Sequence, residues 1–302
     1  MKIFDSGAFY HVFDLAYEPA GFALNGGNLM AAAASKPSYT RAQAGEQISR
    51  GNVKWDGALG TSATVTYAFR SAYDGAVTQY TANFTRFTTA QINQAIASML
   101  SWSDVANITF IRQGDGNTGD PAYSNNAEIL FSNYSDRNIN ASAGYAYSPD
   151  VPSSLSGDIW INVANQNSEV IPYGSFSALT ITHEIAHAIG LEHPGEYNGG
   201  NPTYNMNAEY IEDSKQYTIM SYFEASNTGA SHRIYSAAPL IDDIVAAQRL
   251  YGTNMSTRTG NTIYGFNCTA ERDWFSCVNS DGSPRSVVFA VWDAGGNDTF
   301  DF

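Results

Sequence analysis

Hydrophobic positions recur with a helical period in four parts of the chain. Residues three and four apart share one face of a helix, so apolar residues at these spacings indicate an amphipathic helix. Helices are therefore predicted over 40–50, from 88 to about 105, from about 177 to 190, and over 239–252. In the second of these, the predicted apolar face consists of Ile92, Ile96, Met99 and Leu100.

Shorter segments between these helices have the patterns of strands. Alternating apolar and polar residues indicate a half-buried strand, and short apolar runs indicate a buried one. The predicted strands are 65–69, 108–111, 128–131, 144–147, 158–161 and 287–292. Strands that alternate with long helices predict an α/β or α+β module with a twisted sheet.

The patterns divide the chain into three regions. Residues 1–38 combine a short amphipathic stretch with a tail of small residues, which predicts a leader or N-terminal arm. Residues 39–252 contain the four helices and most of the strands, which predicts the main domain. After this point only short strands and turns follow, so a separate C-terminal region is predicted for 253–302.

Composition and charge narrow the class of protein. The 302 residues are 43% hydrophobic and 15% charged, which is typical of a folded globule. A net charge of −14 and the lack of any basic run argue against nucleic acid as a partner. No stretch has the eighteen or so apolar residues of a membrane span, and the first residues lack the apolar core of a secretory signal peptide.

The two cysteines, Cys268 and Cys277, are nine positions apart in a segment rich in turn-forming and aromatic residues. A local disulfide is the favoured interpretation, and two free buried thiols are the alternative. Because disulfides persist in oxidising compartments, a disulfide would imply a location outside the cytoplasm.

Three of the five histidines lie within eleven residues, and a glutamate follows the first of them. On a helix, His183 and His187 are one turn apart on one face, so both can reach a single ion. Glu184 projects to the neighbouring side, where it can take a proton from a metal-bound water. Gly190 allows a sharp turn that returns His193 as a third ligand. The segment therefore predicts a catalytic zinc site.

Two other interpretations of these histidines compete with catalytic zinc. They could occupy the polar face of an ordinary helix, or they could hold a structural zinc ion. Structural zinc usually has four protein ligands, often thiolates, and neither cysteine is close to the histidines in sequence. Three nitrogen donors beside a carboxylate base therefore favour a catalytic ion.

A second motif follows downstream, Tyr217-Thr218-Ile219-Met220-Ser221-Tyr222. With the histidine segment it resembles the metzincin clan, in which a turn containing a methionine, here Met220, forms a hydrophobic floor beneath the metal. Pro194 and Gly195 after the third histidine, and Tyr222 two residues after the methionine, narrow the resemblance to the serralysin family of secreted bacterial metalloproteases. The resemblance implies that Tyr222 is an additional, displaceable zinc ligand. Segments 36–40, 43–48 and 102–105 are also similar to that family, so the resemblance covers nearly the whole chain.

The resemblance also implies a substrate-binding strand. Gly144, Tyr145, Ala146 and Tyr147 lie in a segment similar to the sheet edge that pairs with extended peptide substrates in metzincins. An edge strand suits this role because its free N–H and C=O groups can bind any peptide backbone. A plain surface strand is the alternative.

Residues 258–262 and 293–298 look like the start of the family's calcium-binding β-roll. Turns of this type offer carbonyl and carboxylate oxygens, the hard ligands that calcium prefers. By resemblance, one calcium ion is surrounded by the backbone oxygens of Arg258, Gly260, Thr262 and Gly295 and by the carboxylates of Asp293 and Asp298. Without the resemblance, 293–298 would be an ordinary hairpin turn.

The chain departs from the family pattern at its end. A serralysin continues with further glycine-aspartate repeats and a C-terminal export signal, whereas this sequence stops at Phe302. We therefore expect a truncated β-roll. The resemblance implies a secreted, extracellular protein, exported without a signal peptide by means of a C-terminal signal that this chain lacks.

Taken together, the resemblance implies an α+β metzincin-type catalytic domain, with a twisted sheet and a long zinc-binding helix, followed by the beginning of an all-β calcium-binding β-roll. The implied activity is a zinc-dependent, calcium-stabilised endopeptidase with protein and peptide substrates. The chain is expected to be a monomer without nucleic-acid or membrane partners, and the family implies a periplasmic protein inhibitor.

Two rival functions remain. Another metzincin such as a matrixin is disfavoured by Pro194, Tyr222 and the calcium turns. A calcium-dependent binding or adhesive protein with a vestigial zinc site is disfavoured by the intact set of histidines with Glu184 and Tyr222.

Overall fold

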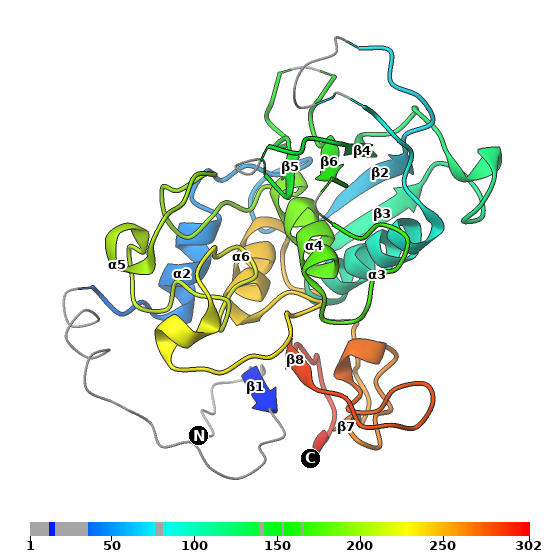
Figure 1. Ribbon diagram of the computed structural model, residues 1–302. Helices are drawn as coiled ribbons and strands as arrows, with labels where there is room; N and C mark the ends of the chain where they lie inside the picture. Colours follow the sequence, from blue (N-terminus) through cyan, green and yellow to red (C-terminus); the bar gives the residue numbers. More distant parts are fainter. Residues whose placement is uncertain are drawn as a thin grey trace.

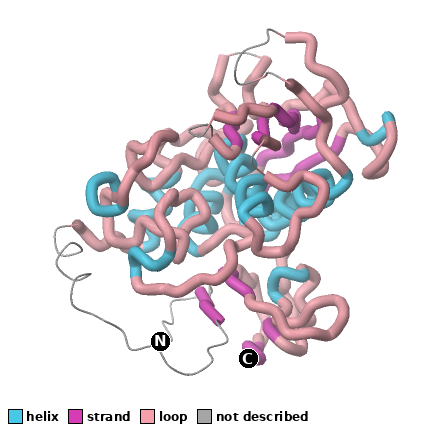
Figure 2. The backbone as a smooth tube through the Cα atoms, in the orientation of Figure 1, coloured by secondary structure: helices cyan, strands magenta, loops and turns pink. Residues whose placement is uncertain are grey.

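The computed structural model describes residues 12–15, 36–75, 81, 83–138, 142–152, 154–164 and 166–302. Most of the predicted N-terminal arm lies outside these residues. Figure 1 shows the described elements in sequence colours, and Figure 2 shows that long loops connect them.

A five-stranded sheet forms one side of the molecule. Its strands, in spatial order, are β3 (Ile108–Arg112), β2 (Ala63–Phe69), β4 (Ile129–Tyr134), β6 (Ile159–Asn162) and β5 (Gly144–Ala146). The first four are parallel, and β5 runs antiparallel to β6 with Gly144 opposite Ile161. All six residues of β4 are buried, as expected for a central strand covered on both faces. The sequence patterns of all five strands are confirmed.

Helices cover the sheet and extend the molecule beyond it. They are α2 (Arg41–Ile48), α3 (Thr89–Val105), α4 (Phe176–Ala188), α5 (Tyr204–Asn207) and α6 (Ile241–Tyr251). Figure 1 shows α3 and α4 side by side next to the sheet, and α2 and α6 together on the other side of α4. Threonine capping boxes, Thr40 with Gln43 and Thr88 with Gln91, start α2 and α3 by satisfying their first amide groups. The four predicted long helices are therefore present, with α4 at the centre.

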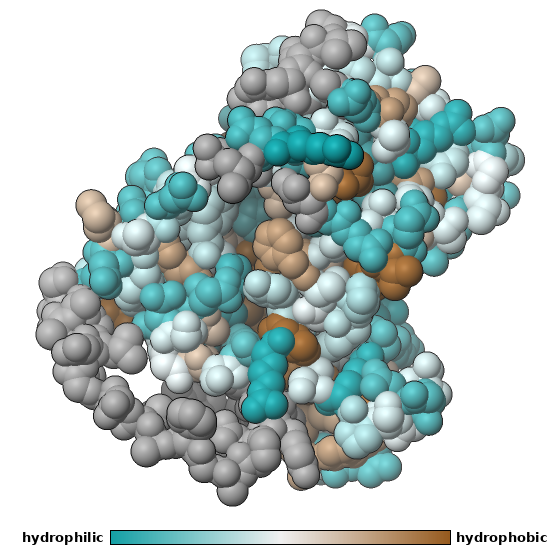
Figure 3. Space-filling model, viewed as in Figure 1, coloured by the Kyte–Doolittle hydropathy of each residue, from teal (hydrophilic) through white to brown (hydrophobic). Residues whose placement is uncertain are grey.

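A single apolar cluster joins the sheet to these helices. It includes Phe69 and Phe131 from the sheet, Trp102 from α3, Ile185 from α4 and Leu250 from α6. On the face shown in Figure 3, hydrophobic residues lie in small separate groups among hydrophilic ones. Within the described residues, no helix combines the length and apolar character needed to cross a bilayer.

One predicted core residue is wrong. Leu100 is 41% exposed, whereas Met99 is buried. The buried stripe of α3 includes Ile92, Met99 and Trp102, and a neighbouring residue is rotated by about 100° from its predecessor on a helix. Leu100 therefore lies on the side of α3 that faces a surface groove.

The C-terminal region follows α6 directly. It contains β7 (Ile263–Gly265) paired in parallel with β9 (Thr299–Asp301), and β8 (Val287–Ala290) paired antiparallel with β1 (Val12–Leu15). Single 3₁₀ turns occur at η1 (Asp120–Ala122), η2 (Ala225–Thr228) and η3 (Asp273–Phe275). The predicted strand 287–292 is thus confirmed for its first four residues.

The favoured disulfide is absent, because Cys268 and Cys277 are free thiols. Cys277 is buried in an apolar cluster with Tyr264, Phe275 and Phe289, and Cys268 packs against that cluster. Aromatic packing therefore holds this segment together without a covalent link. The alternative of two free buried thiols is therefore right about the free thiols, but only Cys277 is buried.

One carboxylate of the main domain binds two arginines of the C-terminal region. Asp104 of α3 accepts hydrogen bonds from Arg258 at 3.0 Å and from Arg272 at 2.9 and 3.0 Å. Asp104 and Arg258 are both nearly buried, so these are charge-assisted bonds with little competition from water.

Candidate metal centre

Two histidines come from the last turns of α4. The helix starts at Phe176 because the Ser175 side chain caps it by accepting from the Ala178 amide. Its apolar residues, such as Ile181 and Ile185, pack into the main core. His183 and His187 are one turn apart on a different face, as their spacing predicts.

A glycine ends the helix and redirects the chain. Gly190 has φ +96°, and a Cβ atom there would lie 2.1 Å from the Val53 carbonyl oxygen. Only glycine fits both conditions, since other residues avoid this backbone conformation and would also collide. The turn brings His193 back toward α4, as the sequence predicts.

The three imidazoles converge on one point. The Nε2 atoms of His183 and His193 are 3.2 Å apart, and those of His187 and His193 are 3.1 Å apart. Two ligands of a tetrahedral zinc ion, at about 2.0–2.1 Å each, lie about 3.3 Å from one another. The separation of these nitrogens therefore fits a zinc ion.

The other ring nitrogen of each histidine is bonded to a backbone carbonyl. His183 donates from Nδ1 to Ile219 at 2.9 Å, and His187 donates from Nδ1 to Leu191 at 2.8 Å. His193 makes a corresponding bond to the backbone of Tyr197. Because the proton is held on Nδ1, each Nε2 presents a lone pair to the common point. This is the donor state that a metal ion requires.

The pKa shifts of the histidines favour the same neutral form of the rings. Burial lowers the pKa of His183 to about 3 and that of His187 to about 4, and it holds the pKa of His193 well below its ordinary value. All three imidazoles are therefore neutral at physiological pH, as ligands must be. Among the described residues, this is the only cluster of three or more histidine, cysteine or acidic side chains with metal-ligand spacing.

Glu184 lies beside the histidines and is 5% exposed. Burial raises the pKa of its carboxyl to about 8. Its Oε2 atom is buried and has no hydrogen-bond partner among the described residues. An unpartnered buried carboxyl oxygen is costly, so this oxygen is open to bonding with a group bound in the site.

The methionine-containing turn lies against the histidines. Met220 is fully buried in the main core, and Ile219 supplies the carbonyl that anchors His183. Asp243 of α6 accepts from the Thr218 hydroxyl, from the Ile219 amide at 2.9 Å and from the Leu240 amide at 2.8 Å. This carboxylate therefore fixes the turn, although no sequence pattern pointed to it.

Tyr222 projects into the site from the same turn. Its ring centroid is 4.6 Å from that of His193 and 6.4 Å from that of His183. Its hydroxyl accepts a hydrogen bond from the Gly199 amide at 3.2 Å. Burial raises its pKa, so the phenol stays protonated and can donate.

The edge strand β5 borders the same site. A cleft of about 570 Å³ is lined by Gly144, Tyr145 and Ala146, by all three histidines, and by Glu184 and Tyr222. Among the described residues, no strand pairs with the outer edge of β5. A Cβ atom on Gly144 would lie 2.9 Å from Glu184 Oε1, so glycine leaves room for the glutamate where the strand passes it. Tyr147 follows the strand and does not line the cleft.

The residues predicted to bind calcium lie together in the C-terminal region. Asp298 accepts from the Thr262 amide at 2.9 Å, and Asp293 accepts from the Gly295 amide at 3.0 Å and from the Tyr264 hydroxyl. Segment 258–262 also contacts Gly295 and Gly296 closely. Arg258 has φ +49°, which turns its backbone at the start of this segment.

Two residues that no sequence motif predicted support the site, Tyr197 directly and Asp213 through Tyr197. Tyr197 stacks on His193 with ring centroids 5.5 Å apart, and its hydroxyl donates to Asp213 at 2.8 Å. A tyrosine four residues after a histidine and an isolated aspartate carry no distinctive spacing. Their positions follow from tertiary packing alone.

Three convergent histidine nitrogens with an adjacent buried glutamate, beside a mixed sheet, are the features of a zinc metalloprotease domain. Comparison with known proteins gives the family. The family model for the C-terminal part of peptidase M10 serralysins matches residues 253–302. Serralysin C of Dickeya chrysanthemi is 42% identical over 276 residues, and metalloprotease AprA of Pseudomonas entomophila is 41% identical over 283 residues. Serralysin of Proteus mirabilis is 40% identical over 280 residues.

Each of these matches covers 88% of this chain and 55% of the relative. The chain belongs to the serralysin family, and it spans about half the length of the relatives it matches. The mixed α/β architecture agrees with a serralysin-type metalloprotease domain.

Proposed function

We propose that this protein is a secreted zinc endopeptidase that cleaves protein and peptide substrates. The observation that carries the proposal is the convergence of three neutral Nε2 donors beside the buried carboxyl of Glu184. His183, His187 and His193 would hold the ion. A zinc ion bound there would polarise the scissile carbonyl and lower the pKa of water.

The other groups of the site have complementary roles. A cation held by the histidines would lower the pKa of Glu184, so that its carboxylate takes the proton of the attacking water and later delivers it to the leaving amine. Tyr222 donates a hydrogen bond from its hydroxyl to the oxyanion that develops on the substrate. Met220 supports the histidines from below without touching the substrate.

The edge strand supplies the binding surface for the peptide backbone. The cleft runs along β5, where the backbone groups of Gly144, Tyr145 and Ala146 can pair with an extended peptide. Backbone pairing is independent of side chains, so this interaction suits a protease that accepts many sequences.

Calcium is proposed as a stabilising ion in the C-terminal region. The backbone oxygens of Arg258, Gly260, Thr262 and Gly295, with the carboxylates of Asp293 and Asp298, form the proposed site. Burial and the nearby charge of Asp293 both raise the pKa of Asp298, and a bound cation would relieve this repulsion.

Replacement of Glu184 tests the proposed function. Glu184→Gln keeps the size of the side chain and removes its basicity, so zinc content should stay at one ion per chain. Hydrolysis of casein should fall by about 10²- to 10⁴-fold, the contribution of a positioned general base. Metal analysis and initial rates on the same preparations provide the measurement.

The outcomes separate the rival functions. Wild-type protein with bound zinc but no peptidase activity would favour the binding-protein alternative. Substantial activity in Glu184→Gln would contradict the role of this residue, and a wild-type chain that binds no zinc would overturn the proposal as a whole.

A further inference from the structure

We propose that Tyr197 and Asp213 are positioning residues for the third histidine ligand, and that Asp213 couples this ligand to the turn that carries Tyr222. The inference rests on the metal centre proposed above. It adds a role for two residues that no motif identifies.

The third ligand needs support from outside the helix. His183 and His187 are held by the backbone of α4, whereas His193 lies in the loop after it. Tyr197 contacts His193 in two ways. Its ring stacks on the imidazole with centroids 5.5 Å apart and planes 23° apart, and its backbone accepts the hydrogen bond of the histidine.

The Tyr197 side chain is itself held by two contacts, one at its hydroxyl and one at its ring. Its hydroxyl donates to Asp213 Oδ1 at 2.8 Å, and both residues are buried. Its ring packs edge-on against Phe223 with centroids 4.9 Å apart. Because the side chain cannot rotate without breaking a buried bond, the ring defines one orientation for His193.

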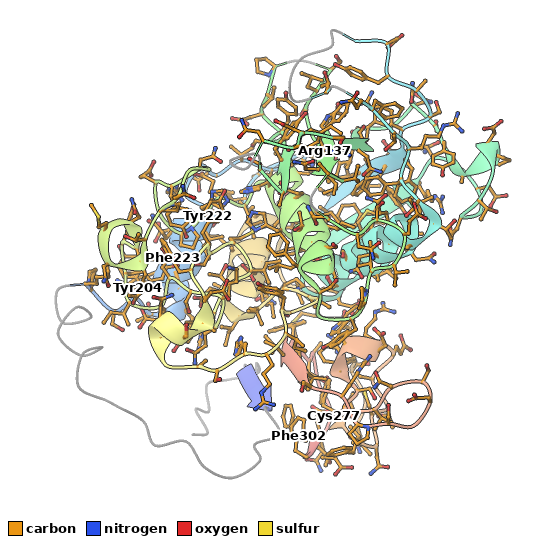
Figure 4. The ribbon with its side chains drawn as sticks, in the orientation of Figure 1. Arg137, Tyr204, Tyr222, Phe223, Cys277 and Phe302 are labelled. Carbon is orange, nitrogen blue, oxygen red and sulfur yellow. The ribbon has the colours of Figure 1, made fainter. Side chains whose placement is uncertain are left out.

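The same carboxylate oxygen holds the turn with the proposed oxyanion donor. Asp213 Oδ1 also accepts from the Ser221 hydroxyl at 2.6 Å, and Ser221 Oγ accepts from the Phe223 amide at 3.1 Å. Tyr222 lies between these two residues, and its ring is 5.0 Å from that of Tyr197. Figure 4 shows Tyr222, Phe223 and Tyr204 gathered on the side of α4 nearer to α2 and α5. The buried Asp213 carboxylate therefore fixes both Tyr197, which stacks on His193, and the turn that carries Tyr222.

Tyr197→Phe is the main test, because it keeps the stacked ring and the backbone acceptor and removes only the hydroxyl that donates to Asp213. We expect zinc affinity, measured by competition with a fluorescent chelator, to fall by about 10-fold, the lower end of the range for changes in the groups that orient a metal ligand. The zinc dissociation rate should rise correspondingly. Both measurements are independent of peptidase activity.

Tyr210→Phe is the matched control. Tyr210 is a fully buried tyrosine in the same acidic surroundings, and its hydroxyl has no hydrogen-bond partner among the described residues. Removing that hydroxyl breaks no bond, so zinc affinity should stay at the wild-type value.

Ser221→Ala tests the bond between Asp213 and the turn of Tyr222 separately from the bond between Asp213 and Tyr197. It should leave zinc affinity within about twofold of wild type and lower kcat on a peptide substrate, with KM little changed, because it releases the turn of Tyr222 alone.

The proposal is overturned if Tyr197→Phe binds zinc as tightly as Tyr210→Phe, even if its melting temperature is lower, since that result would show a purely structural role. A Ser221→Ala variant with unaltered kcat would refute the coupling. Failure of the wild-type chain to bind zinc would be a different outcome, because it would remove the metal centre itself.

Discussion

At the level of single residues, the histidines are set up as ligands by their second nitrogen. Nδ1 of His183 is committed to the Ile219 carbonyl and Nδ1 of His187 to the Leu191 carbonyl, while His193 interacts with the backbone of Tyr197. Burial keeps the three rings neutral. Three lone pairs that face one another without a cation would repel, so the arrangement favours metal binding. The bonds that create this preference come from the loop after α4 and from the later turn that contains Ile219.

Replacement of Tyr222 tests its proposed role at this scale. Tyr222→Phe keeps the ring that packs against His193 and Tyr197 and removes the hydroxyl donor. We expect kcat to fall by about 10²- to 10³-fold, the usual cost of losing one oxyanion donor, with KM nearly unchanged. Steady-state kinetics on a defined peptide would measure this, and zinc content serves as the control.

An unaltered kcat in Tyr222→Phe would remove the hydroxyl from the mechanism. A loss of zinc would instead show that the tyrosine acts on the metal site rather than on the reacting substrate.

At the level of elements, the site depends on where α4 stops. The chain leaves the helix at Gly190 and passes within contact of Val53, so the return of His193 needs a residue without a side chain. A helix that ran one turn further would carry His193 away from its partners. Assembly of the three histidines therefore depends on the end of α4 as well as on the residues within it.

Gly190→Ala should therefore be severely destabilising. The added methyl group meets the Val53 carbonyl at 2.1 Å in a left-handed backbone conformation, so we expect a loss of about 2–4 kcal/mol in the free energy of unfolding. Chemical denaturation of the zinc-free chain would measure it. Gly229→Ala is the control, because Gly229 has a similar φ of +93° but no atom within 4 Å of the added Cβ.

Gly229→Ala should cost only about 1–2 kcal/mol, the conformational term alone. Equal losses in the two variants would show that the contact with Val53 does not matter.

Local patterns in the sequence predicted most elements, because each depends on neighbours within a few residues. The helical period placed His183 and His187 on one face, and Gly190 predicted the turn. Leu100 was misplaced because two adjacent apolar residues compete for one face, and only packing decides between them. The disulfide was favoured wrongly for a similar reason, since the aromatic cluster that holds Cys277 is a tertiary feature.

The residues that orient the metal ligands could not be predicted from the sequence, for a physical reason. Asp213 and Asp243 act through buried bonds to residues elsewhere in the chain, and an aspartate beside another acidic residue has no distinctive period or motif. Tyr197 is recognisable only after the loop is folded. Motifs therefore predicted the ligands, and the fold was needed to find what orients them.

At the level of the whole molecule, Asp104 connects the C-terminal region to the helix that underlies the sheet. Its two arginine partners, Arg258 and Arg272, flank the first strand of that region. Since Arg258 also starts the proposed calcium segment, the position of this segment depends on a carboxylate of the main domain. The two regions are thus joined by charge as well as by packing.

Asp104→Asn should loosen this junction. It leaves two guanidinium groups without their anion, so we expect a loss of about 2–4 kcal/mol in unfolding free energy and earlier proteolytic cleavage after residue 252. Zinc content should be unaffected. Denaturation and timed proteolysis would measure both effects.

Asp120→Asn is the control, because the Asp120–Arg86 pair is exposed and should contribute less than about 1 kcal/mol. A junction that resists protease equally in both variants would show that apolar contacts alone hold the C-terminal region.

The closeness of the three histidines in sequence has a consequence for the order of folding events. A loop of only eleven residues must close to assemble all three donors, so the entropic barrier to that step is small. A nascent chain could capture an ion soon after this segment emerges, long before Asp243 and Ile219 are in place. The bonds to Ile219 and Asp243 would then affect the rate at which the metal dissociates more than the rate at which it binds. Completion of the fold would therefore slow the dissociation of the metal.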